Sequence, residues 1–207
     1  MMKLKNISIL TILLFILTGC FEAATNSRAQ NGTKSNVLGP GTGGGNGAIG
    51  TIEKTYDEIE GSLYNRETVI KNRIQENLRG PYVKLEVKSL MNKDSLDMDE
   101  QDRGIIHKAI KRFSEYGNPI VVLHGTDTMQ QTAELVQKEM SECSVPVIFT
   151  GAMKPLGFID SDAIQNVTEA MFAAQIVKPG VYISFHNRLF SVPGVRKNKM
   201  NRTFERF

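Results

Sequence analysis

The stretch from Ile120 to Thr132, with the sequence IVVLHGTDTMQQT, constrains the fold of this chain most strongly. It opens with four apolar residues in a row, three of them β-branched, which is typical of a strand buried on both faces in a parallel sheet. The run breaks at His124-Gly125, and a helical pattern begins near Thr128. In α/β folds, ligand sites form beyond the carboxyl ends of the strands, where such strand–glycine–helix turns lie.

Thr126 and Asp127 are expected at that strand end. A hydroxyl and a carboxylate there can bind a polar ligand, or hold a water between them as a proton acceptor. The alternative is structural, because Thr and Asp are preferred helix caps and Asp127 or Thr128 would then only start the following helix.

The chain after residue 66 alternates helical and strand patterns. Helices are expected at 67–78, 99–116, 128–143 and 163–175, and strands at 83–90, 120–124, 145–150 and 181–185, with a short hairpin or loop at 188–195. This order predicts βαβ units and a parallel sheet, hence an α/β fold.

The amino-terminal segment from Met1 to Cys20 predicts an export signal outside the fold. Lysines precede an apolar run, Ile7–Leu17, that is shorter than the ~20 residues of a membrane-spanning helix. The run ends in Leu-Thr-Gly-Cys, which resembles a bacterial lipobox, so residues 1–19 would be removed and Cys20 lipidated. The protein would be exported and lipid-anchored to a bacterial membrane, on the periplasmic or cell-surface side. An ordinary signal peptide with an incidental cysteine is the alternative.

Residues 20–49 are expected to form a tether, because Gly39–Gly50 is dominated by glycine. A phosphate-binding loop is disfavoured, since the Gly-Lys-Ser/Thr ending is missing. A net charge of +3 with interleaved acidic and basic residues gives no sign of nucleic-acid binding. Cys143 would have no disulfide partner in the mature chain and is expected to pack in the core.

His124-Gly-Thr-Asp-Thr128, together with Gly151-Ala-Met-Lys-Pro155, resembles the asparaginase/glutaminase family of two-threonine amidohydrolases. The resemblance implies that residues 50–207 form the amino-terminal domain of that family, a three-layer α/β fold with a Rossmann/flavodoxin-like parallel sheet. Asp160-Ser-Asp-Ala163 and Asn166 fit the same pattern, and they are expected to cap a helix and bind the loop. Lys154 would line the mouth of the site or be a solvated loop lysine.

The family resemblance also assigns the nucleophile. Ile49-Gly50-Thr51-Ile52 is similar to the turn whose threonine attacks the amide carbon, which makes Thr51 the matching residue. Tyr56 is the expected activating tyrosine, with Tyr64 as the alternative. The apolar strand that should precede this turn is missing directly upstream of the glycines.

The rest of the implied site comes from three later segments. Thr126 would be the second catalytic threonine, and Asp127 would hold the amino-acid end of the substrate. Ser95 matches the serine that grips the α-carboxylate. Lys197 matches a lysine that reaches Thr126 and lowers its pKa, with Lys199 as the fallback. Equally, Lys197 would belong to a basic surface cluster, together with Arg196, Lys199, Arg202 and Arg206.

The implied function is hydrolysis of the side-chain amide of L-asparagine, or of a related amide, through an acyl-enzyme on Thr51. Backbone N–H groups at the glycine turns would form the oxyanion hole. No metal or organic cofactor is implied, the substrate would be a small amino-acid amide, and a homo-oligomer is expected from the family.

A catalytically degenerate, lipid-anchored amino-acid-binding module is the alternative function. Three features favour it: the missing first strand, Leu96 at a position where the family often has Gln, and a chain that stops before the family's second domain.

Overall fold

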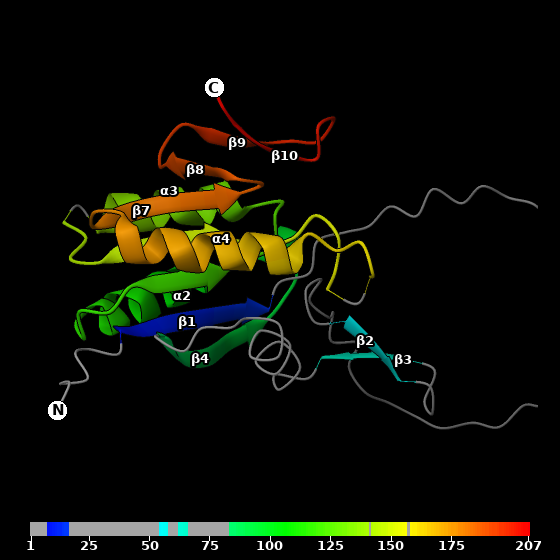
Figure 1. Cartoon of the computed structure of the whole chain (residues 1–207), viewed down its shortest axis with the longest axis horizontal. Coiled ribbons are helices and arrows are strands. Elements are labelled where there is room, and N and C mark those ends of the chain that lie inside the picture. The colour runs from blue at the N-terminus through cyan, green and yellow to red at the C-terminus, as the bar shows by residue number, and fades with distance from the viewer. Residues whose placement is uncertain (1–7, 17–53, 58–61, 66–82, 141, 157) are drawn as a thin grey trace, which may run out of the picture.

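The computed structural model describes residues 8–16, 54–57, 62–65, 83–140, 142–156 and 158–207. One six-stranded sheet dominates these parts of the chain, with the order β4-β1-β5-β6-β7-β8 (Figure 1). Its strands are β1 (Ser8–Ile16), β4 (Val83–Asn92), β5 (Ile120–Leu123), β6 (Pro146–Thr150), β7 (Gly180–Phe185) and β8 (Arg188–Ser191).

The strand order is that of a flavodoxin-like sheet with one added strand. The pairs β4–β1, β1–β5, β5–β6 and β6–β7 are parallel, and only β7–β8 is antiparallel. The order reverses between β1 and β5, and a ligand crevice is expected outside the carboxyl ends of the strands at such a switch point. The predicted α/β class with a mostly parallel sheet is therefore confirmed.

The first strand is where the structure departs from expectation. We expected Met1–Cys20 to lie outside the fold and the domain to begin at Gly50, without its first strand. Instead Ser8–Ile16 fills the position between β4 and β5, pairing Ser8 with Val83 and Thr11 with Ile120. A largely apolar run is typical both of an inner strand of a parallel sheet and of an export signal, so hydropathy alone did not separate the two.

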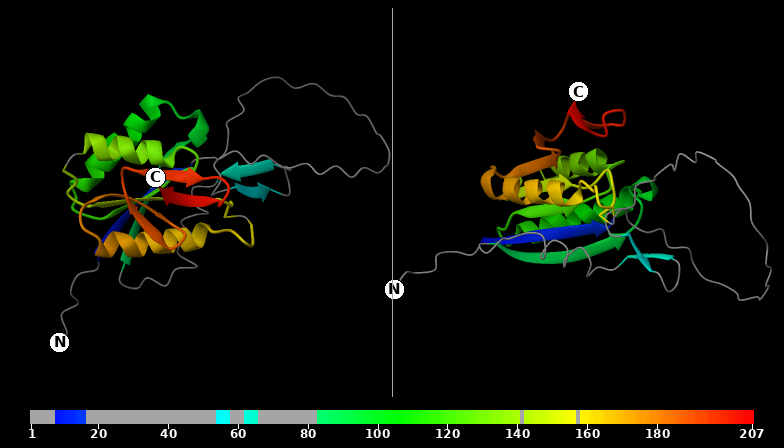
Figure 2. Two further views of the ribbon diagram at one scale, coloured as in Figure 1. Left: turned by 90° about the horizontal axis from the view of Figure 1, so that it is seen from above. Right: turned by 45° about the vertical axis from the view of Figure 1, so that its right-hand side comes forward.

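In the described part of the chain, three helices cover the two faces of the sheet: α2 (Glu100–Ser114), α3 (Met129–Glu139) and α4 (Ala163–Ile176). Viewed from above, α2 and α3 lie on one side of the strands and α4 on the other (Figure 2). One apolar cluster, with Val122, Phe149 and Ile183, joins the sheet to α2 and α3. A second, with Val121, Ile148 and Ala170, joins it to α4. Side chains alternate between the two faces along β5 and β6. Each of these strands therefore contributes residues to the apolar cluster on either side of the sheet.

The predicted helices and strands of this region are confirmed, with ends that shift by a few residues. Asp99 caps α2 as expected, in a capping box with Asp102. The segment after β8 adds a separate antiparallel pair, β9 (Val195–Asn198) and β10 (Thr203–Arg206).

Another antiparallel pair, β2 (Lys54–Asp57) and β3 (Ser62–Asn65), carries Tyr56 and Tyr64. The predicted helix 67–78, the tether 20–49, Cys20 and Thr51 lie outside the described residues. Of the helices that the structure describes, none has the length and apolar character needed to cross a membrane.

Candidate functional site

Three side chains meet beyond the carboxyl end of β5. The Nζ of Lys197, on β9, donates to Thr126 Oγ1 at 2.7 Å and to Asp127 Oδ1 at 2.9 Å. The lysine and aspartate side chains are only 16% and 14% exposed, and Thr126 is buried. An ion pair so largely withdrawn from water is held in a defined geometry, unlike a pair of solvated surface charges.

The helix-capping alternative for this turn is wrong. Thr128 is the N-cap residue of α3, but its side chain makes no capping hydrogen bond. Its hydroxyl donates instead to the carbonyl oxygen of Ser95, at 2.7 Å. The carboxylate of Asp127 accepts from Lys197. Both polar side chains of the turn are therefore used for tertiary contacts.

His124 fixes the backbone of the same turn from inside the core. Its Nδ1 lies 2.8 Å from the carbonyl oxygen of Gly125, so this nitrogen carries the proton and donates. Nε2 then accepts from the hydroxyl of Thr132, also at 2.8 Å. Complete burial lowers the pKa of His124 to about 4, so the imidazole is neutral at ordinary pH.

Gly151 allows the loop after β6 to pass directly against this turn. A Cβ atom at position 151 would lie 2.2 Å from the carbonyl oxygen of His124, a separation that no side chain tolerates. The loop after β6 and the turn after β5 are thus in backbone contact, and a movement of one displaces the other.

Ser95 lies at the start of a short 3₁₀ helix, η1 (Ser95–Asp97), which follows β4. The carboxylate of Asp94 caps it by accepting from the Leu96 N–H at 2.8 Å. Ser95 itself is fully buried, and its hydroxyl has no hydrogen-bond partner within the described parts of the chain. Since a buried hydroxyl without a partner is costly, this oxygen is available to a polar ligand group.

Two basic side chains hold η1 against the helices. Lys93 forms an ion pair with Asp102 of α2, which raises the lysine pKa. Burial is the largest single influence on the pKa of Asp102 and would raise it, but the hydrogen bond and charge of Lys93, together with hydrogen bonds from Asp99, outweigh it and lower that pKa. Arg103 donates to the Met98 carbonyl at 2.9 Å and to Gln131 Oε1 at 3.2 Å, which ties the segment after η1 to α3.

The other basic residues of the carboxyl-terminal hairpin are used differently. Lys199 is exposed in the turn between β9 and β10, so the fallback lysine does not occupy the site. Arg196 pairs with Glu205 on the surface, and Arg206 donates to Ser191. The basic-cluster interpretation therefore fits the neighbours of Lys197 and not Lys197 itself.

Two further residues considered from the sequence lie apart from this chemistry. Lys154 pairs with the exposed Asp160 and lies over the ring of Phe158. Cys143 packs against the core, and burial raises its thiol pKa. Where the structure describes the chain, no group of three His, Cys, Asp or Glu side chains is arranged to hold a metal ion.

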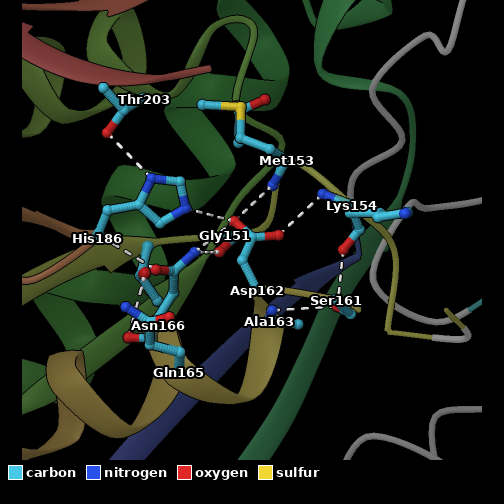
Figure 3. Close-up of polar contacts among 12 residues, drawn as sticks. Gly151, Met153, Lys154, Ser161, Asp162, Ala163, Gln165, Asn166, His186 and Thr203 are labelled. Atoms are coloured by element: carbon cyan, nitrogen blue, oxygen red, sulfur yellow. Dashed lines mark hydrogen bonds and ion pairs between the residues drawn. The ribbon is translucent and has the colours of Figure 1, made fainter. Parts of the chain in front are cut away.

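A second polar network, centred on Asp162 at the start of α4, was only partly expected (Figure 3). The carboxylate accepts from the backbone N–H of Met153 and of Lys154, at 3.0 and 2.9 Å. It also accepts from Asn166 Nδ2 and from His186 Nε2, both at 2.9 Å. Binding of the loop by Asp162 agrees with the sequence analysis, whereas side-chain capping of α4 by Asp162 does not occur.

The part played by His186 in this network had no sequence signal that we recognised. The residue lies between β7 and β8, in the two-residue turn that joins them. A pair of residues that both favour positive φ, such as Asn-Gly, is the usual signature of such a turn, and His-Asn departs from it. This unusual residue pair is the only feature of the sequence that could have drawn attention to His186.

The fold and this site define an α/β protein with a lysine–threonine–aspartate cluster at the ligand-binding edge of its sheet. The chain belongs to the asparaginase family, because the family model described as "Asparaginase, N-terminal" matches residues 46–206.

Individual relatives are similar to parts of this chain. The chain is 32% identical over 119 residues to the L-asparaginase of Thermococcus kodakarensis, covering 57% of this chain and 35% of the relative. It is 33% identical over 157 residues to the 60 kDa lysophospholipase of Homo sapiens, covering 74% of this chain and 27% of the relative. In these sequence alignments the chain thus spans about a third of the first relative's length and about a quarter of the second's.

Comparison of structures supports the fold. The solved structure of the Thermococcus kodakarensis L-asparaginase superimposes with a TM-score of 0.69 at 22% sequence identity, covering 95% of this chain and 51% of that chain.

Proposed function

We propose that this protein is an amidohydrolase that hydrolyses the side-chain amide of L-asparagine, or a related amide, to the carboxylate and ammonia. The observation that carries the proposal is the contact of Lys197 with both Thr126 and Asp127. Membership of the asparaginase family and the names of relatives such as the Thermococcus enzyme support the substrate class.

Thr51 is the proposed nucleophile, and its assignment rests on the Gly50-Thr51-Ile52 motif. Its hydroxyl would attack the amide carbon and give up its proton with the help of Tyr56, the amide nitrogen would gain that proton and leave as ammonia, and water would then hydrolyse the acyl-enzyme to the carboxylate. Splitting the hydrolysis in this way replaces one difficult step by two easier ones.

Thr126 and Lys197 are the proposed proton-transfer pair. For this role the ion-paired Lys197 would first have to release its extra proton; the neutral amine would then accept the proton of Thr126, and Thr126 would in turn accept a proton from the attacking group. Asp127 supports this role by orienting the lysine Nζ at 2.9 Å. The close packing around the pair fixes the distance over which the proton moves, and such positioning is essential for general base catalysis.

Ser95 and Asp127 are the proposed substrate-binding residues. The unpartnered Ser95 hydroxyl suits a carboxylate oxygen, and the Asp127 carboxylate suits an ammonium group. The bond from Thr128 to the Ser95 carbonyl supports this pairing, because it links the two segments that carry the groups.

A binding module without turnover is the second candidate. Leu96, 53% exposed beside Ser95, provides no amide for the substrate, which favours this candidate. Both candidate functions require the same ligand, so they differ only in whether the bound amide is hydrolysed.

Lipid anchoring at Cys20, export and a homo-oligomeric state remain proposals from the sequence. Lipid anchoring at Cys20 requires removal of residues 1–19, and this removal would also take β1 out of the sheet. A processed, anchored chain and the sheet described above therefore cannot coexist in one molecule.

Ammonia release from L-asparagine by the full chain tests the proposed function. The full chain is needed because β1 is part of the sheet. Thr51→Ala should remove most of the activity. Activity that persists would mean that Thr51 is not the nucleophile, with Thr42 and Thr55 as the next candidates. No ammonia release alongside intact aspartate binding would decide for the binding module.

A further inference from the structure

His186 lies in a backbone conformation that is uncommon for residues other than glycine, although histidine adopts it more often than most. Its φ is 46°, and the next residue, Asn187, has a φ of 62°. Both lie in the left-handed region, which glycine and asparagine adopt at the lowest cost. A histidine held there calls for a compensating interaction, and residues in such conformations cluster at functional sites.

The imidazole of His186 joins two segments that carry no direct side-chain bond to each other. Nε2 donates to Asp162 Oδ2 at 2.9 Å, because a carboxylate surrounded by N–H donors acts only as an acceptor. On the other side of the ring, Nδ1 lies 3.1 Å from Thr203 Oγ1 of β10. Figure 3 shows the ring lying between the two partners. The shorter side chain of asparagine cannot span both contacts from the same backbone.

One end of this bridge leads to Lys197. Thr203 pairs with Asn198 in the β9–β10 hairpin, and Phe204 pairs with Lys197. Phe204 docks the hairpin through its buried ring, 5.0 Å from that of Phe185. An aromatic contact leaves freedom to slide and tilt, whereas the bond to Thr203 fixes the position of the strand pair. The bond from His186 thus adds a fixed point beside Lys197, while Phe204 and the bond from Arg206 to Ser191 attach the hairpin to the sheet.

The other end leads to the turn that carries Thr126. Asp162 holds the backbone of residues 153 and 154, and Asn166 Nδ2 donates to the Gly151 carbonyl at 2.9 Å. Gly151 in turn lies against the His124 carbonyl, two residues before Thr126. Asn166 Oδ1 also accepts from the backbone N–H of His186 at 3.1 Å. The network therefore reaches both segments that carry the Lys197–Thr126 pair, the β9–β10 hairpin and the turn after β5.

We propose that His186 is a positioning residue, whose imidazole links Thr203 to the Asp162 carboxylate and thereby holds Lys197 at bonding distance from Thr126. This inference rests on the proposed function, because it gives Lys197 its part in turnover. His186 itself does not touch the reacting groups. Its loss should leave Ser95 in place on η1, and Asp127 in the turn between β5 and α3 should keep its place in the chain path because β5 and α3 are held by their own core contacts.

Steady-state kinetics of ammonia release by full-length variants test this proposal. His186→Asn keeps a residue suited to positive φ and removes the bridge, while Thr203→Val removes the other partner at constant size. Each should lower kcat by about tenfold to a hundredfold, as a displacement of about 1 Å does. KM should stay within about twofold, because substrate binding is retained. The double variant should be scarcely worse than either single variant.

Two control variants distinguish the effect of losing the imidazole hydrogen bonds from the effect of changing the turn that carries His186. Asn187→Gly relieves the neighbouring positive φ and leaves the imidazole in place, so it should keep the parental kcat. Thr203→Ser retains the hydroxyl and should also keep it. Unchanged kcat in both His186→Asn and Thr203→Val would overturn the proposal. An equal loss in Asn187→Gly would also overturn it, by assigning the effect to the turn.

Amide hydrogen exchange provides a readout that does not depend on activity. The amides of Lys197 and Phe204 should exchange about tenfold faster in His186→Asn, while those of β5 keep their protection. A parent protein that releases no ammonia would refute the proposed function alone, and faster exchange of the hairpin would then still support the bridge. Unchanged exchange would refute the bridge.

Discussion

Lys197 and Thr126 lie 71 positions apart in the chain, yet the lysine Nζ donates a 2.7 Å hydrogen bond to the threonine Oγ1. The contact joins the carboxyl-terminal hairpin to the turn after β5, and it exists only because both segments dock at the same edge of the sheet. Its burial, and the shared partner Asp127, distinguish it from the surface ion pairs of the same hairpin.

Ligand binding should depend on Asp127. L-Aspartate, the product of the proposed reaction, should raise the Tm of the parent protein by mass action, even in a catalytically dead variant. Asp127→Ala should abolish the shift, because the α-ammonium loses its carboxylate partner. Differential scanning fluorimetry at millimolar aspartate measures this.

Asp160→Ala is the matched control for this measurement. It removes another lysine-paired aspartate, but one on the surface, 65% exposed, where ion pairs contribute about 0–1 kcal/mol. The aspartate-induced shift should survive. A parent protein that shows no shift would count against both the amidohydrolase and the binding module.

Stability should fall on acidification because of His124. Its pKa is about 4 in the folded protein and about 6.5 when unfolded, so the unfolded chain binds the extra proton between these values. Full stability is present above pH 6.5 and is lost progressively toward pH 4, by roughly 3 kcal/mol at most. Urea unfolding measured between pH 7.5 and pH 4.5 follows this change.

His124→Gln should flatten that pH dependence, since it removes the titrating group. The carboxyls of Asp102 and Glu205, whose pKa values are lowered in the fold, also lose stabilising interactions on acidification, but at lower pH. An unchanged slope in His124→Gln would show that the acid sensitivity arises elsewhere.

Gly151 should not tolerate a side chain. In Gly151→Ala the new Cβ would approach the His124 carbonyl to 2.2 Å, so the backbone must shift at a cost of about 1–3 kcal/mol. Thr126 would shift with it, and activity should fall as well as stability. Gly104→Ala is the control, because that helical position is open and alanine there should stabilise by about 0.5–1 kcal/mol. Equal effects at both positions would contradict the backbone contact.

The role of residues 8–16 can be decided by backbone disruption. Ile12 pairs with Val87 on one side and Val121 on the other, so Ile12→Pro removes a hydrogen-bond donor from the middle of the sheet. We expect loss of cooperative unfolding, whereas Cys20→Ser should leave the fold unchanged. A stable protein recovered from membranes without residues 1–19, and released by Cys20→Ser, would instead establish the lipid anchor and exclude β1 from the mature sheet.

The sequence was sufficient to predict the elements whose patterns have a single interpretation. Four apolar residues before His124-Gly125 predicted β5, and the order of elements placed Ser95 and Thr126 at one edge of the sheet. The first strand was not predictable, because an apolar run preceded by lysines fits both an export signal and an inner strand of a parallel sheet. The bridge by His186 was not predictable either. It depends on a positive φ and on the approach of a distant hairpin, and neither leaves a periodic signal.

The central claim is that Lys197 acts in amide hydrolysis through Thr126, and ammonia release from L-asparagine by Lys197→Met tests it most directly. Loss of a positioned base should lower kcat by about 10²–10⁴-fold, more severely at low pH, where hydroxide cannot substitute. Thr126→Ala should do the same, and the double variant should be scarcely worse than either. Lys199→Met, an exposed lysine of the same hairpin, should retain the parental rate. Parental activity in Lys197→Met, or equal losses at positions 197 and 199, would contradict the account.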